Sequence, residues 1–103
     1  IEDVTFVKNK LTEITIPNSV TRIGDSAFRE NLLTKITIPN SVTTISDSAF
    51  RENQLTQVTI PKSVIAIGNK AFYNNKLTEI TIPGSTVLNG QVFDEGVIIN
   101  KYF

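Results

Sequence analysis

The 103-residue chain contains no cysteine, histidine, methionine or tryptophan. Without cysteine the chain has no thiolate nucleophile and no disulfide to hold the fold, and without histidine it has no imidazole base. The usual zinc ligands are missing for the same reason. We therefore expect a protein without enzymatic activity, metal or other cofactor.

Charge of one sign and long apolar runs are lacking as well. Ten basic residues balance ten acidic ones, and no basic run is present. Phosphate backbones require a positively charged surface, so we expect no nucleic-acid partner. No apolar run approaches the roughly 18 residues of a membrane span, so we expect no direct membrane insertion. The chain begins at Ile1, which suggests a mature or excised part of a longer protein.

What the sequence does contain is a repeat. The eight residues ITIPNSVT stand at Ile14 to Thr21 and again, letter for letter, 22 positions later at Ile36 to Thr43. A period in this range is typical of a solenoid, in which each turn, called a coil below, stacks on the next. The columns of equivalent residues include Phe6, Phe28, Phe50 and Phe72; Asn9, Asn31, Asn53 and Asn75; and Pro17, Pro39, Pro61 and Pro83.

Each coil has a predictable internal order. The segment LTEITIP alternates apolar and polar residues, which indicates a short strand that Pro17 ends because proline has no N–H for a ladder. The later segment DSAFREN indicates a helical turn with Asp25 as N-cap, and the next rows offer Asp47 and Asn69 at that position. We expect the asparagine column to satisfy backbone groups at a tight corner and the phenylalanine column to form a core spine.

The unit L-T-x-I-T-I-P-x-S-V-T-x-I-G-x-x-A-F-x-x-N-x, starting at Leu11, resembles the BspA-like class of bacterial leucine-rich repeats. The resemblance implies an α/β-type leucine-rich repeat solenoid, with one short parallel strand per coil and short helical or irregular convex segments. The right-handed crossover rule makes the solenoid right-handed. The resemblance also implies a cell-surface or secreted bacterial protein that adheres to host or extracellular-matrix proteins, and it carries no catalytic motif.

The repeat divides the chain into three parts. We expect residues 1–10 to be the tail of a preceding or capping coil, residues 11–83 to form the regular coils, and residues 84–103 to form an altered fourth coil with a closing segment. Val97 to Ile99 could add an edge strand there. The strand at Leu11 has no cover, so edge-to-edge self-association is possible.

The outward face of the predicted sheet is the candidate binding surface. Repeat proteins use such faces for recognition because outward residues can vary without disturbing the core. A face of this size falls short of the roughly 800 Å² that a stable partner interface needs, so the chain alone should bind weakly. The alternative is a structural spacer or capping array that displays a neighbouring domain. The outward positions are Glu13, Thr15, Lys35, Thr37, Gln57, Thr59, Glu79 and Thr81.

Overall fold

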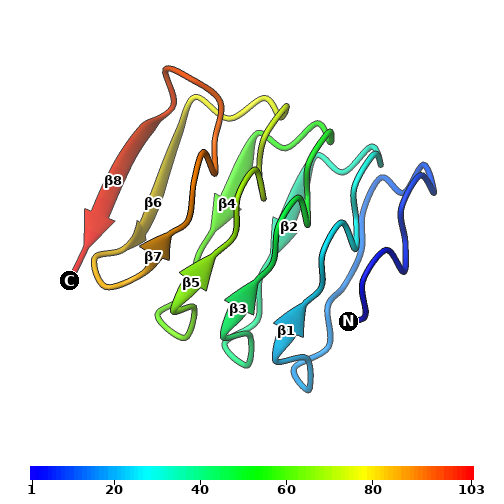
Figure 1. Ribbon diagram of the computed structural model, residues 1–103, viewed down its shortest axis with the longest axis horizontal. Helices are drawn as coiled ribbons and strands as arrows, with labels where there is room; N and C mark the ends of the chain where they lie inside the picture. Colours follow the sequence, from blue (N-terminus) through cyan, green and yellow to red (C-terminus); the bar gives the residue numbers. More distant parts are fainter.

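The computed structural model describes residues 1–103 as a stack of coils whose two chain ends lie at opposite ends of the stack (Figure 1). Two parallel sheets of four strands run along the stack, and there is no helix. The larger sheet contains β2 (Lys35–Thr37), β4 (Gln57–Thr59), β6 (Glu79–Pro83) and β8 (Ile98–Tyr102). The smaller sheet contains β1 (Arg22–Ile23), β3 (Thr44–Ile45), β5 (Ala66–Ile67) and β7 (Val87–Leu88).

The larger sheet follows the predicted pattern. Lys35 pairs with Gln57 and Thr37 with Thr59, so equivalent residues of successive repeats are neighbours in the parallel ladder. The central Ile36 is buried while its two strand neighbours are exposed, as the period-2 alternation of a strand requires. The predicted parallel strand of each coil is therefore confirmed for β2, β4 and β6.

The smaller sheet was not predicted. Its strands are two residues long, too short to show an alternating pattern, yet Thr44 pairs with Ala66 and Ile45 with Ile67 in strict repeat register. The inward side chain of each of the first three strands is an isoleucine that is fully buried: Ile23, Ile45 and Ile67. Three coils thus contribute two strands each instead of one: β2 with β3, β4 with β5, and β6 with β7.

The phenylalanine column forms the predicted spine. Phe28, Phe50 and Phe72 are fully buried, and neighbouring rings are stacked with centroids 5.4 Å apart and planes within 8° of parallel. Phe6 extends the spine at one end at 5.2 Å, and Phe93 extends it at the other at 5.8 Å. Each coil buries one ring between two neighbouring coils.

The asparagine column satisfies the corner backbone as predicted. The Asn53 amide donates to the carbonyl oxygens of Phe28 (2.9 Å) and Phe50 (3.0 Å), and its Oδ1 accepts from the Leu33 N–H (3.1 Å). Asn31 and Asn75 make equivalent bonds. The bonds reach back to the preceding coil, so each asparagine ties its own corner to the one before it.

The predicted helical turn at DSAFREN is wrong. Ser26 and Glu30 have positive φ values of 54° and 57°, and the same left-handed conformations recur at Ser48 and Glu52. A helix cannot contain them. The N–H groups of Ser26, Phe28 and Glu30 donate instead to carbonyls of the next coil at 2.8–2.9 Å, so contacts between coils replace the bonds within a helix.

Two of the three predicted N-cap residues, Asp47 and Asn69, have a different role, which Asp3 shares. The Asp3 carboxylate accepts from the Asp25 N–H (2.8 Å), and Asp47 accepts from the Asn69 N–H (2.9 Å). The Asn69 side-chain oxygen accepts in turn from the Gln91 N–H (2.9 Å). This second side-chain column therefore reaches forward to the following coil, and it caps no helix.

The first predicted strand, from Leu11 to Pro17, is also absent. Residues 11–16 lie next to β2 without a strand ladder. An apolar hollow of about 460 Å³ opens beneath this segment, lined by residues that include Ile1, Phe6, Leu11, Ile14, Val20 and Phe28.

At the other end the repeat shortens but the stacking continues. Ala66 pairs with Val87, 21 positions on, and Glu79 pairs with Ile98, 19 positions on. Thr86 replaces a buried valine, and its hydroxyl donates to the Val64 carbonyl at 2.8 Å. The edge strand predicted near Val97 to Ile99 is observed as β8, a five-residue strand.

Candidate binding face

The outward side chains of the larger sheet form two columns along the stack. One column contains Glu13, Lys35, Gln57 and Glu79, and the other contains Thr15, Thr37, Thr59 and Thr81; all eight are exposed. The ladder brings Thr37, Thr59 and Thr81 side by side on adjacent strands. The predicted positions from β2 to β6 are therefore brought together on one face. Glu13 and Thr15 lie beyond β2 on the segment without a ladder.

β8 adds a fifth row that sequence periodicity does not reveal. Ile98 is placed next to Glu79, and Asn100 next to Thr81. The Asn100 amide approaches the Glu79 carboxylate at 3.5 Å, a weak contact at the limit for a hydrogen bond. The face therefore changes from charged and polar in the first four rows to partly apolar in the fifth.

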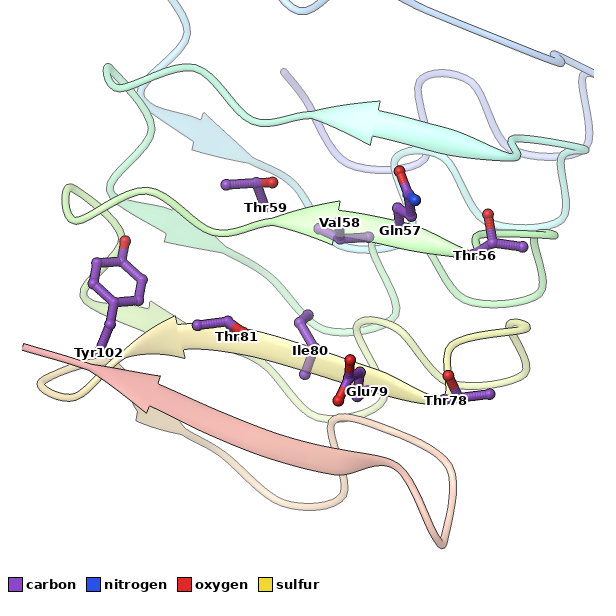
Figure 2. A pocket seen from close by; sticks show the side chains of 9 residues that line it. All are labelled: Thr56, Gln57, Val58, Thr59, Thr78, Glu79, Ile80, Thr81 and Tyr102. Carbon is purple, nitrogen blue, oxygen red and sulfur yellow. The ribbon is translucent and has the colours of Figure 1, made fainter.

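A groove of about 520 Å³ separates β4 from β6 on this face, and Figure 2 shows its lining. The two strands are paired at Thr59 and Thr81, and at the other end the Lys76 N–H donates to the Leu55 carbonyl at 2.9 Å. Between these two points the strands separate. The groove is lined by Thr56, Gln57, Val58, Thr59, Thr78, Glu79, Ile80, Thr81 and Tyr102.

Tyr102 closes one end of the groove and is fixed in place. Figure 2 shows the Tyr102 side chain at the end of the groove, and its hydroxyl donates to the Ile60 carbonyl at 2.8 Å, across 42 residues of sequence. A second hollow of about 570 Å³ begins on this tyrosine and extends over Lys62, Asn40 and Asn18 along the row of prolines. Because β8 lies out of the 22-residue period, nothing in the repeat pattern predicts that Tyr102 reaches the coil of Ile60.

The outward face of the larger sheet displays the threonine hydroxyls, the amides of Gln57 and Asn100, the ammonium group of Lys35 and the carboxylates of Glu13 and Glu79. All of these residues are exposed. No group of three or more potential metal ligands lies together anywhere in the chain. The structure also has no helix with the length and apolar character needed to cross a bilayer.

A comparison with protein families identifies the repeat. The family model described as the BspA type leucine rich repeat region (6 copies) matches residues 1–101. The chain belongs to the BspA-type leucine-rich repeat family. The match includes residues 1–10 and most of residues 84–103, the two parts in which the repeat is hardest to recognise.

A solved structure from this class of protein shares the fold. The chain is similar to a leucine-rich repeat protein from Eubacterium ventriosum, with a TM-score of 0.59 and 25% sequence identity. The match covers 80% of this chain and 28% of that protein's chain, so this chain corresponds to less than a third of its structural relative. A search of curated proteins finds no match.

Proposed function

We propose that the chain is a non-catalytic, adhesive protein-interaction module of a bacterial cell-surface or secreted protein. The family supports this proposal, because BspA-type leucine-rich repeats are generally surface and interaction modules. The proposed contact surface is the eight-residue outward face of the larger sheet.

One observation carries the proposal. Lys35 and Gln57 occupy the same outward position in successive coils, and both are exposed although they differ in charge. Ile36, the next residue after Lys35, points inward and is buried. Changing an outward side chain therefore leaves the core unchanged, and the face can acquire specificity without loss of the fold. A solenoid that served only as a spacer would not need one outward column to vary from coil to coil beside a column of identical threonines.

The expected partner is a folded protein with a mixed, polar surface. The outward column alternates acidic, basic, neutral and acidic groups, so it complements no surface of one charge. The face is smaller than the roughly 800 Å² per partner of a stable interface. We therefore expect weak binding by one chain and stronger binding by a longer array or by many copies on one surface.

The test is binding of the immobilised chain to a panel of extracellular-matrix and serum proteins. The variant Glu13→Ala/Lys35→Ala/Gln57→Ala/Glu79→Ala removes the variable column. The control Arg22→Ala/Thr43→Ala/Ile65→Ala changes three exposed residues in or beside the smaller sheet. We expect saturable binding by the parent and the control, and a loss of at least tenfold in affinity for the variant.

Absence of binding by a well-folded parent chain would contradict the adhesive function and favour the spacer. Equal loss of binding in the control and the variant would show that the larger sheet is not the contact surface.

A further inference from the structure

β8 is an exposed edge strand with an apolar character. It has β6 on one side and no strand on the other. Ile98 and Ile99 are 60% and 42% exposed, and Phe103, directly after the strand, is 97% exposed. Edge strands that are long and apolar are pairing sites unless a charge, a proline or a covering segment blocks them. β8 carries one lysine and no proline.

The unpaired backbone groups of β8 can be assigned. The Ile98 N–H donates to the Thr78 carbonyl at 3.0 Å, and the Tyr102 carbonyl accepts from the Gly84 N–H at 2.8 Å. Backbone groups alternate in direction along a strand, so Ile98, Asn100 and Tyr102 face β6. The N–H and C=O groups of Ile99 and Lys101 therefore point to the free edge.

We propose that β8 pairs in antiparallel register with β8 of a second copy of this chain, about a two-fold axis at Asn100. In this register Ile99 lies opposite Lys101 of the second copy, and each exchanges both backbone hydrogen bonds with the other. The symmetry repeats the exchange, so four hydrogen bonds use every free N–H and C=O of the two strands. No other antiparallel register of β8 with itself uses all of them.

The side chains are compatible with this register. Ile98 lies opposite Tyr102 of the second copy, so an apolar residue meets an uncharged one. Asn100 lies opposite itself, and two amides can hydrogen-bond to each other. Lys101 lies opposite Ile99, so no like charges meet directly.

A second copy is a better occupant of the β8 edge than the N-terminal end of another chain. Head-to-tail stacking would place β8 against residues 11–16, which form no strand and lie over an apolar hollow. The two-fold contact instead joins two strands that are already formed, and it closes at two chains. The contact consists of one five-residue strand from each copy, so it is smaller than a standard interface and the dimer should dissociate on dilution.

A disulfide test uses the absence of cysteine from the chain. Asn100 and its copy form a non-hydrogen-bonded pair with Cα atoms about 4.5 Å apart, within the range that a disulfide spans. Asn100→Cys should therefore form a covalent dimer under mild oxidation. Thr81→Cys is the matched control, because three strand spacings separate it from its copy by about 14 Å, too far for a disulfide.

Sedimentation measurements test the same contact without a covalent bond. The parent chain should change from monomer to dimer with rising concentration and form nothing larger. Ile99→Pro removes an edge-facing N–H but no bond to β6, so it should weaken dimerisation at least tenfold with the circular dichroism spectrum unchanged. Val4→Lys, at the opposite end of the stack, should leave the dimer unaffected.

Two outcomes would overturn the proposal. One is a parent chain that stays monomeric while Asn100→Cys and Thr81→Cys oxidise to dimers at equal rates. The other is an open-ended series of oligomers that Val4→Lys abolishes, which would identify head-to-tail stacking. Both are independent of whether the outward face binds a protein.

Discussion

At the scale of single residues, the recurring asparagine explains why one polar side chain is kept inside an apolar core. Asn53 is 2% exposed and its one amide satisfies two carbonyls and one N–H. No apolar side chain of similar volume could do this. Asn9 occupies the equivalent position in the first coil, where no earlier corner exists. Its side chain is exposed, and its amide donates one weak hydrogen bond of 3.3 Å to the Val7 carbonyl.

We expect Asn53→Leu to lower the free energy of unfolding by about 1–3 kcal/mol, since the buried Leu33 N–H loses its partner. The carbonyls of Phe28 and Phe50 each keep one asparagine amide as donor. Asn9→Leu serves as the matched control, with an expected loss below about 1 kcal/mol. Urea denaturation monitored by circular dichroism measures both. Similar small losses for the two variants would show that the asparagine bonds contribute little.

At the scale of elements, the corner between β3 and β4 is built from left-handed turns. Ser48 has a φ of 57° and its N–H donates to the Asn69 carbonyl of the next coil at 3.0 Å. A non-glycine residue in this conformation costs roughly 1 kcal/mol. Bonding between coils compensates for this strain at every corner.

Ser48 therefore distinguishes the turn from the helix that the sequence suggests. In the turn, Ser48→Gly should raise the free energy of unfolding by about 0.5–1 kcal/mol, and Ser48→Ala should not. In a helix the order would be reversed, because alanine is the better helix former by about 1 kcal/mol. Thermal and urea unfolding of the two variants decide between the two conformations, and a more stable alanine variant would contradict the observed turn.

These elements also show what the sequence could and could not predict. The inward columns, the strand before each proline and the asparagine corners follow from periodicity, because one side chain must contact its own copy in the next coil. Ser26 and Glu30 were assigned to a helical turn because no local pattern reveals that their N–H groups bond to another coil. The repeat pattern does not predict that Tyr102 lines the groove, because its contact with Ile60 depends on the shortened last repeat. The handedness of the solenoid and the binding role of the face remain predictions.

At the scale of the whole molecule, stability is shared between neighbouring coils. The two sheets and the aromatic spine from Phe6 to Phe93 join neighbouring coils along the stack, so an inner coil is held from two sides and an end coil from one. Stability should therefore rise with the number of inner coils.

Repeating residues 33–54 directly after Gln54 tests this coupling. The insertion adds one inner coil of 22 residues, and we expect the midpoint of urea denaturation to rise. The slope of free energy against urea should increase by roughly a fifth, in proportion to the surface exposed on unfolding. An unchanged slope would mean that the coils unfold one by one and not together.

The two chain ends lie at opposite ends of the stack, and this placement determines how the protein responds to a pulling force. The hydrogen bonds between coils run along the stack, in the direction that joins the two ends (Figure 1). A pulling force applied to the ends therefore opens one coil boundary at a time and does not shear a whole sheet at once. Each released coil lengthens from about 4.8 Å to about 75 Å of extended chain. A protein built in this way yields at low force over a long distance, and it would absorb the work of a sudden pull in steps of one repeat.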